Sequence, residues 1–147
     1  MDVRDLPLRL GAGAYILSSG VDKLSADEET AAGYHGMAAG AYPFLADVDP
    51  VTFTKALAAT EIALGAGLLL PVAPRKLLAA GFTAFSAGLV GMYWRTPSLR
   101  RGPRDPRPSP DGVGVAKDVI LLGASASYLL HALTRRSGHR RQRVRRG

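Results

Sequence analysis

The charged residues of this chain are gathered into short segments, and the long windows between these segments contain almost no Lys, Arg, Asp or Glu. The four windows cover residues 6–24, 51–70, 77–94 and 113–133. Each has about the 17–25 residues with which a helix crosses a hydrocarbon core of ~30 Å. Leu, Ala and Gly dominate the windows, and polar and apolar residues do not alternate in them, which favours helices over the strands of a barrel. The pattern predicts an all-α fold, an integral membrane four-helix bundle.

A soluble four-helix bundle is the alternative, because the whole chain is only 47% hydrophobic and its mean hydropathy is +0.06. Each helix of a soluble bundle would need a continuous polar face. The third window, "LLAAGFTAFSAGLVGMYW", has no charged residue on any side, which favours the membrane. We expect the first window to be retained as a helix rather than cleaved as a signal peptide, since no clear small-residue cleavage pattern precedes Asp22 and Lys23.

The remaining segments complete a four-span membrane domain over residues 1–134. An outer loop, 25–50, contains the apolar stretch "GYHGMAAGAYPFL", which is too short to span and is expected to form an interfacial or re-entrant segment packed over the helices. The loop 95–112 is rich in Pro and Arg and is expected to be extended and poorly ordered. Residues 135–147 form a basic tail with seven arginines, for which we expect disorder and attraction to anionic lipid rather than nucleic-acid binding.

Basic residues near the ends of the windows predict which side of the cell membrane each loop faces. An even number of spans places both termini on one side, and Lys and Arg are enriched on the cytoplasmic side. The side with the termini holds eleven of these residues, and the opposite side holds eight. The loop 25–50, on the opposite side, is acidic and contains neither Lys nor Arg. We therefore predict a multi-pass cell-membrane protein with both termini in the cytoplasm.

One carboxylate, Glu61, lies in the middle of the second window. It follows Val51 by ten residues, or about 15 Å along a helix, so it is expected near the centre of the bilayer. Insertion scales put the cost of a carboxylate there at about 2.5–3.5 kcal/mol. We expect Glu61 to be protonated, or to be paired with a cation or hydrogen-bond donors inside the bundle, and not to face lipid.

Helical spacing identifies residues that could surround Glu61. One stripe of the first window holds a cation near each end with small residues between them: Arg9, Gly13, Ile16, Gly20 and Lys23. Its glycines let a second backbone approach closely. Lys23 and Asp118 should lie at similar depth, and we expect an ion pair between them, whereas Arg9 would have to reach up to Glu61. The alternatives are that both cations snorkel to the headgroups and that Asp118 is an N-terminal helix charge favoured by the helix macrodipole.

The candidate polar site for a ligand or a proton therefore consists of Glu61, Arg9, Lys23 and Asp118. Further candidates for lining a pocket there are Tyr15, Tyr34, His35 and Lys117. We predict no catalytic residue. We also predict no metal site, because the histidines show no ligand-like spacing. The chain has no cysteine, which excludes a disulfide or a thiol relay within it.

Three segments carry these residues, and together they resemble the DoxX family of small four-helix bacterial membrane proteins. "RLGAGAYILSSGVDKL" is similar to the first-helix signature of that family at Arg9, Gly13, Gly20, Lys23 and Leu24. "EIALGAGLLLP" resembles its second-helix signature at Glu61, Gly65 and Gly67. "VAKDVILLGAS" resembles its last-helix signature at Lys117, Asp118 and Gly123, while "YHGMAAGAYPFL" and "YWRTP" resemble the actinobacterial branch. The resemblance covers about Leu6 to Leu133.

The resemblance implies a membrane subunit or anchor of a quinone-linked or thiol-linked oxidoreductase assembly that handles oxidative or thiol stress. The family is named after a subunit of an archaeal thiosulfate:quinone oxidoreductase, so quinone is the ligand implied, and redox proteins or a second copy of the chain are the partners implied. The sequence has no haem-like or flavin-binding motif, so we do not expect it to be an autonomous enzyme. The alternative is a transporter-like or scaffold membrane protein whose buried charges are structural.

Overall fold

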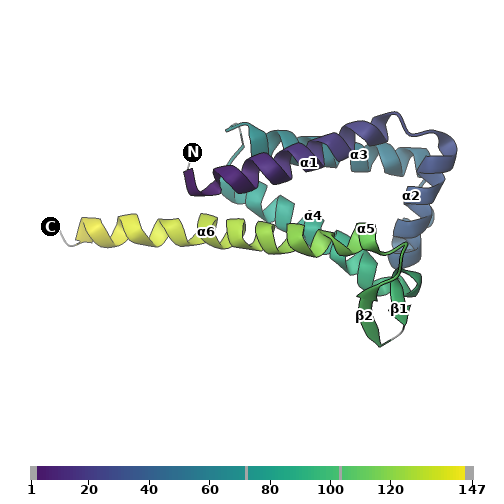
Figure 1. The fold of residues 1–147 in the computed structure, drawn as a ribbon. Helices are drawn as coiled ribbons and strands as arrows, with labels where there is room; N and C mark the ends of the chain where they lie inside the picture. The colour runs from purple at the N-terminus through teal and green to yellow at the C-terminus, as the bar shows by residue number, and fades with distance from the viewer. Residues whose placement is uncertain (1–2, 72, 103, 145–147) are drawn as a thin grey trace.

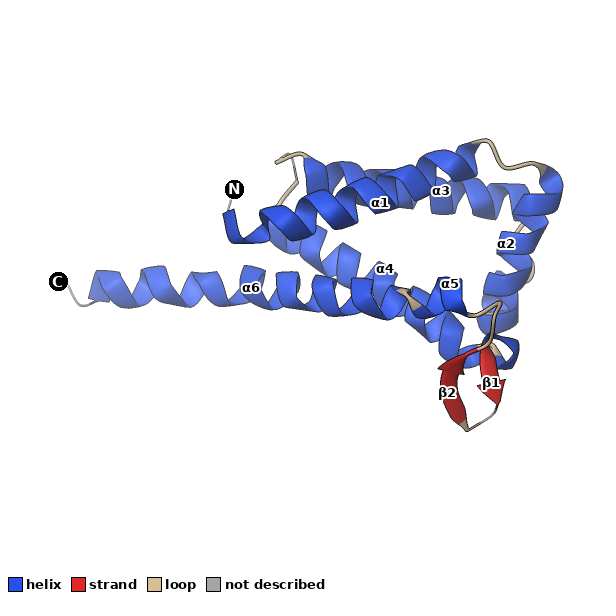
Figure 2. Ribbon diagram, in the orientation of Figure 1, coloured by secondary structure: helices blue, strands red, loops and turns tan. Residues whose placement is uncertain are grey.

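The computed structural model describes residues 3–71, 73–102 and 104–144, with side chains up to Thr134. Most of this chain is helical (Figure 2). In chain order the elements are η1 (Val3–Asp5), α1 (Leu6–Leu24), α2 (Glu28–Ala41), η2 (Pro43–Leu45), α3 (Pro50–Leu69), α4 (Arg75–Arg95), η3 (Pro97–Leu99), β1 (Arg100–Gly102), β2 (Asp105–Pro108), α5 (Val113–Ala116) and α6 (Asp118–Val144).

Each predicted window is helical, and the helices differ in how well they suit a membrane. Within the described residues, three helical segments are long and apolar enough to cross a bilayer: Pro50–Leu69, Arg75–Arg95 and Val113–Thr134. α1 is of similar length but carries Arg9, Asp22 and Lys23, which lower its mean hydropathy. Three of the four predicted spans are therefore supported by length and composition. Whether α1 can also cross a membrane depends on which groups bind its charged side chains.

The long helices form two antiparallel pairs, α1 with α3 and α4 with α6 (Figure 1). η1 and the C-terminal half of α6 lie toward the same end of the molecule, as expected for an even number of traverses. The pairs meet near that end and separate toward the other, where α2 lies across the gap and contacts both α3 and α4. The apolar stretch predicted to lie at an interface thus belongs to α2 and η2, which close one end of the helix pairs.

The two helix pairs are joined by an apolar core close to the chain ends. Its most buried members come from all four long helices: Ile16, Leu68, Leu78, Ala79, Phe82, Tyr128 and Ala132. Away from this core, many large apolar side chains point outward; Leu77 is 70% exposed and Ile120 is also 70% exposed. Outward apolar side chains on long helices suit contact with lipid better than contact with water.

Glycines allow α1 and α3 to pack in close contact. The buried residues of α1 are Arg9, Gly13, Ile16 and Gly20, so the predicted stripe is the face that contacts α3. A Cβ placed on Gly65 would lie 2.6 Å from the backbone nitrogen of Leu17 and 2.8 Å from the carbonyl oxygen of Gly13. Such distances are too short for any real Cβ atom, so the contact requires glycine.

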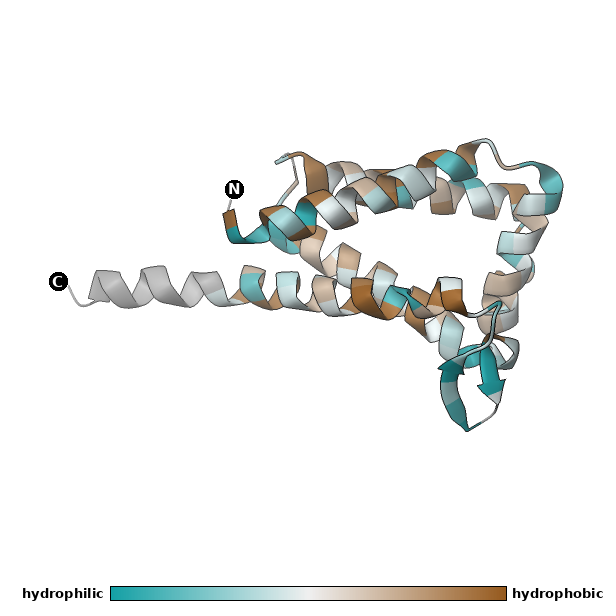
Figure 3. Ribbon diagram, viewed as in Figure 1, coloured by the Kyte–Doolittle hydropathy of each residue, from teal (hydrophilic) through white to brown (hydrophobic). Residues whose placement is uncertain are grey.

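The loop 95–112 differs from the prediction of a poorly ordered segment. It forms a short antiparallel hairpin in which Arg100 lies opposite Pro108 and Gly102 opposite Asp105. The hydroxyl of Tyr93, on the last turns of α4, donates a hydrogen bond to the carbonyl of Pro106 at 2.6 Å and ties the hairpin to the helix. Figure 3 shows this hairpin as hydrophilic, while the helices carry apolar residues along much of their length.

The basic tail also differs in part from its prediction. The backbone of α6 continues as a helix to Val144, through most of the segment expected to be disordered. Arginine is a good helix former, which favours this continuation. The side chains after Thr134 and residues 145–147 lie outside the described residues, so the lipid attraction of the tail stays a prediction.

An exposed ion pair in the hairpin gives a pH-dependent prediction. Arg107 donates hydrogen bonds to the Asp105 carboxylate from its side chain, at 2.7–3.1 Å, and from its backbone N–H, at 3.0 Å. These hydrogen bonds lower the pKa of Asp105 to about 2. Because the folded pKa is below the usual 3.8, the contribution of this pair to hairpin stability is present above that value and is lost as the pH falls toward 2.

We expect Arg107→Ala to raise the pKa of Asp105 toward its usual value, since the side-chain hydrogen bonds are the largest cause of the shift. The measurement is an NMR titration of the Asp105 carboxyl carbon in detergent micelles. Arg104→Ala is the control, because Arg104 is exposed and belongs to the same hairpin without bonding Asp105. An equal pKa in both variants would contradict the assignment.

Candidate functional site

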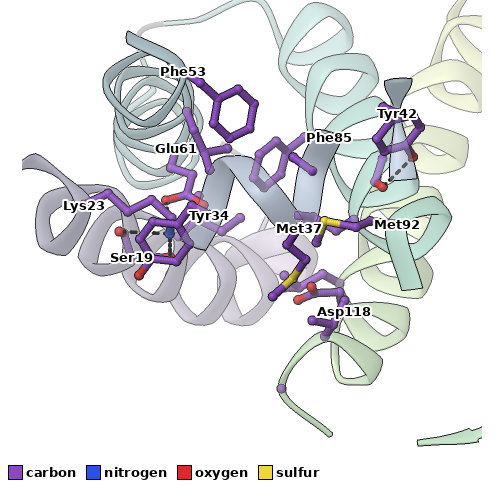
Figure 4. Close-up of a pocket in the computed structure, with 18 of the residues that line it drawn as sticks. Ser19, Lys23, Tyr34, Met37, Tyr42, Phe53, Glu61, Phe85, Met92 and Asp118 are labelled. Atoms are coloured by element: carbon purple, nitrogen blue, oxygen red, sulfur yellow. Dashed lines mark hydrogen bonds and ion pairs between the residues drawn. The ribbon is translucent and has the colours of Figure 1, made fainter. Parts of the chain in front are cut away.

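A pocket of about 460 Å³ lies where the two helix pairs separate. Its walls come from α1, α2, α3, α4, α5 and α6, so residues far apart in the sequence meet there. Most of the lining is apolar or aromatic, and it includes Met37, Phe53, Leu57, Phe85 and Met92. Figure 4 shows the polar side chains at two places on this apolar surface, with Lys23 and Glu61 on one side and Asp118 on the other.

Glu61 and Lys23 form an ion pair on the α1–α3 side of the pocket. The Lys23 Nζ lies 2.9 Å from Oε2 of Glu61, and the two side chains are 11% and 6% exposed. Gly20 makes this pairing possible, because a Cβ placed on it would lie 2.9 Å from the Cβ of Glu61. We predicted that Glu61 has a polar partner inside the protein, and this is confirmed. The partner is Lys23, which belongs to the same stripe of α1 as Gly13 and Gly20.

Lys23 uses all its donors within the protein. Besides Glu61, its ammonium group donates to the hydroxyl of Ser19 at 2.7 Å and to the carbonyl of Ser19 at 3.3 Å. The Nζ also lies 5.2 Å from the centroid of the Tyr34 ring, close enough for a cation–π contact. An ammonium group has three N–H donors, so the paired Lys23 has none left for a ligand.

Asp118 lies on the opposite wall of the same pocket, at the first residue of α6. Its side chain is half-buried, and within the described part of the chain it has no hydrogen bond or ion pair. The predicted ion pair between Asp118 and Lys23 is therefore wrong, because Lys23 is bound to Glu61 instead. The pocket thus contains a satisfied ion pair and, facing it, a carboxyl group that remains free to accept a hydrogen bond.

Arg9 has a different role from the one predicted. Its guanidinium group does not reach Glu61 but donates to the carbonyls of Gly67, Leu68 and Leu70, at distances of 2.6–3.1 Å. These belong to the C-terminal end of α3, where backbone carbonyls have no partner within the helix and a positive charge is favourable. Arg9 is only 7% exposed, so it caps α3 from inside the bundle rather than snorkelling to the surface.

The predicted lining residues divide into two groups. Tyr15 and Tyr34 line the pocket. His35 does not, because its Nε2 bonds the Leu45 carbonyl at 2.8 Å and its ring packs edge-on against Phe53. Lys117 is exposed between α5 and α6 and is not part of the lining either. The structure therefore brings together Glu61, Lys23, Asp118, Tyr15 and Tyr34, and leaves Arg9, His35 and Lys117 outside.

The sequence interpretation missed a second polar group, which we name the terminal cluster: Asp5, Arg75 and His131. Asp5 is 6% exposed; Arg75 pairs with its Oδ2, and Nδ1 of His131 lies 2.8 Å from its Oδ1. Each of these residues alone resembles an ordinary charge near a membrane surface, and no spacing in the sequence relates them. Only the meeting of η1, α4 and α6 reveals the cluster.

No group of three or more His, Cys, Asp or Glu residues that could hold a metal ion occurs in the described ranges. Comparison of the chain with protein-family models, with curated proteins and with solved structures gave no match. The candidate site is therefore defined by the geometry of this chain alone. The resemblance to the DoxX family rests only on the three sequence segments described above.

Proposed function

We propose that the chain is a four-span membrane protein of the DoxX type whose pocket binds a quinone- or quinol-sized ring molecule, as the non-autonomous membrane subunit of an oxidoreductase assembly. The observation that carries this proposal is the apolar pocket of about 460 Å³ with the unpartnered Asp118 carboxyl opposite the Lys23–Glu61 pair. Small-molecule sites in proteins are commonly apolar cavities of this size with a few placed polar groups.

The partners of the α1 charges support α1 as the fourth span. Arg9 is bound by the carbonyl groups at the end of α3, and Lys23 is bound by Glu61. Asp22 is exposed two residues before the end of the helix, where it would be near the surface of a bilayer. With its interior charges satisfied by α3, α1 presents lipid with Leu10, Val21 and other outward apolar side chains.

The polar groups of the pocket favour a ligand that donates hydrogen bonds. Lys23 has no free N–H, whereas the Asp118 carboxyl is an acceptor without a donor. The hydroxyl of a quinol could donate to it, while the ring would lie among Tyr34, Phe85 and Met92. Because the sequence contains no haem-like or flavin-binding motif, the electrons in such an assembly would be handled by a partner protein.

The test is equilibrium binding of a radiolabelled decyl-chain benzoquinol to the full chain in lipid nanodiscs. We expect Asp118→Asn to weaken binding by about tenfold or more, because a hydrogen bond to a charged group is worth about 1.5–3 kcal/mol. Asp111→Asn is the matched control, since Asp111 is exposed outside the pocket and should not alter the affinity. Wild-type protein that does not bind, or an unchanged affinity of Asp118→Asn, would count against the proposal.

A scaffold protein is the second candidate, and the saturation of Lys23 and Arg9 by protein groups favours it. In that case the buried charges only hold α1 against α3, and Glu61→Gln would lower the unfolding temperature without altering any ligand affinity. Purification from native membranes separates the two functions, because the proposed subunit should carry quinone and a redox partner whereas the scaffold should carry neither.

A further inference from the structure

Two fully buried hydroxyl groups on α4 and α6 have no hydrogen-bond partner among the described atoms. They belong to Ser86 and Tyr128, which are 0% and 1% exposed. The buried Nε of Arg75, whose guanidinium carbon lies 5.4 Å from the centroid of the Tyr128 ring, is unpartnered as well. A buried polar group without a partner costs about 1–3 kcal/mol, and such groups are usually satisfied by ordered water. Water between α4 and α6 would satisfy all three.

These groups lie between the pocket and the terminal cluster. On α6, Asp118 lines the pocket, and Ser125 and Tyr128 are buried on the same side of the helix. The Ser125 hydroxyl donates to the Leu122 carbonyl at 2.9 Å, and its oxygen can still accept a hydrogen bond from water. The steps from Asp118 to Ser125 and from Ser125 to Tyr128 are about 10 Å and about 5 Å along the axis. Tyr128 is followed three residues later by His131 of the terminal cluster.

Ser86, on α4, lies between Asp118 and Ser125 along the axis and so divides the longer step of about 10 Å. α4 and α6 are antiparallel, and Arg75 contacts His131, which fixes their relative position. Ser86 follows Arg75 by eleven residues, which places it about 3 Å from the level of Asp118 and about 7 Å from that of Ser125. Measured along the helix axes, neighbouring groups in this series are then about 3–7 Å apart, a spacing that one or two water molecules can bridge.

The terminal cluster connects this series of polar groups to solvent at the end of the molecule where η1 lies. The side chains of Arg75 and His131 are 25% and 29% exposed, whereas Asp5 behind them is 7% exposed. Arg75 is always protonated and contributes a fixed positive charge, while Asp5 and His131 are groups that accept and release protons. At the other end, Asp118 is the acceptor, and Glu61 and Lys23 face it across the pocket.

We infer that water between α4 and α6 forms a proton route from the terminal cluster to Asp118, through Tyr128, Ser125 and Ser86. Each hydroxyl or water accepts a proton on one lone pair and releases its own proton to the next oxygen. For each proton that enters at His131 or Asp5, Asp118, the first residue of α6, releases one into the pocket and from there to the other side of the membrane. No electron moves and no bond other than O–H or N–H is made or broken. The route ends in the pocket of the proposed function but does not require that its ligand be a quinol.

The experiment measures proton flux in vesicles of phosphatidylcholine and phosphatidylglycerol that contain the full chain and an enclosed pH-sensitive dye. A potassium gradient with valinomycin drives protons inward. We expect flux above that of protein-free vesicles, and we expect Tyr128→Phe to reduce the protein-dependent flux by about tenfold, the factor that ~1.4 kcal/mol of added barrier produces. Ser86→Ala should also reduce the flux, and this variant replaces Tyr128→Phe as the test if Tyr128→Phe does not fold.

Thr60→Val is the matched control. Thr60 lies on α3 rather than on α4 or α6 and its side chain is exposed, so removal of its hydroxyl should leave the flux unchanged. Wild-type flux equal to that of protein-free vesicles, or folded Tyr128→Phe and Ser86→Ala proteins with wild-type flux, would overturn the inference. If the chain conducts protons but does not bind the quinol, the proton route is supported and the proposed ligand is wrong. If it binds the quinol but does not conduct protons, the ligand is supported and the route is wrong.

Discussion

Replacing Lys23 with Met is expected to lower the free energy of unfolding by about 3–5 kcal/mol, the usual cost of removing one member of a buried ion pair. Glu61 would keep its buried position, with 6% of its side chain exposed, but would lose the ammonium group 2.9 Å away. Methionine is similar in length to lysine, so the apolar stem would still pack and the change would isolate the charge. The measurement is loss of helical circular dichroism during titration with a denaturing detergent in mixed micelles.

Two further variants make this prediction specific to the pair. Lys55→Met removes the same charge from an exposed position on α3 and should change stability by less than about 1 kcal/mol. Adding Glu61→Met to Lys23→Met should recover much of the lost stability, because apolar replacements of a whole buried pair are often neutral. Equal losses in Lys23→Met and Lys55→Met would show that the pair does not stabilise the fold.

Gly65→Val is the second substitution with a large expected effect, a loss of about 3 kcal/mol, at the upper end of the usual cost of overpacking. The added side chain would meet the backbone of Leu17 on one side and of Gly13 on the other. Backbone atoms cannot move aside as the end of a flexible side chain does, so α1 and α3 would have to separate. Lys23 and Glu61 lie on the same interface, and their pairing should weaken along with it.

The control for this prediction is Gly123→Val on α6. A Cβ at Gly123 would meet nothing within 4 Å, so this variant carries the intrinsic helix cost of valine without the clash. Both variants should be unfolded with the same denaturing detergent, and the difference between them isolates the α1–α3 contact. A Gly65→Val protein as stable as Gly123→Val would mean that the helices can separate without loss.

Regular spacing made the contact face of α1 predictable from sequence. Arg9, Gly13, Ile16 and Gly20 recur at helical intervals, and they are the buried residues of α1. The apolar length of the windows likewise predicted the positions of the long helices, because burial and backbone hydrogen bonding leave few other conformations for such segments in a membrane.

Partners across the fold were much less predictable. Arg9 binds backbone carbonyls, which every residue has, so no residue type in α3 identifies its partner. Lys23 was assigned to Asp118 by depth alone, but depth does not determine which helices are adjacent, and α1 packs on α3. The hairpin was not predicted because it is held by backbone carbonyls, which no residue type identifies: Tyr93 binds that of Pro106, Arg101 that of Pro108 and Ser109 that of Ser98. Spacing within a helix was informative, whereas contacts between helices needed the structure.

The capping of α3 by Arg9 has a consequence for biosynthesis. α1 leaves the ribosome before the end of α3 exists, so Arg9 at first has none of the carbonyls at Gly67, Leu68 and Leu70 to bind. A basic residue within a lone inserting helix costs about 2.5–3.5 kcal/mol toward the bilayer centre and less near its edge. In the four-span topology that we propose, α1 is therefore expected to stay near the membrane surface, or beside the insertion machinery, until α3 has been made and the two helices insert together.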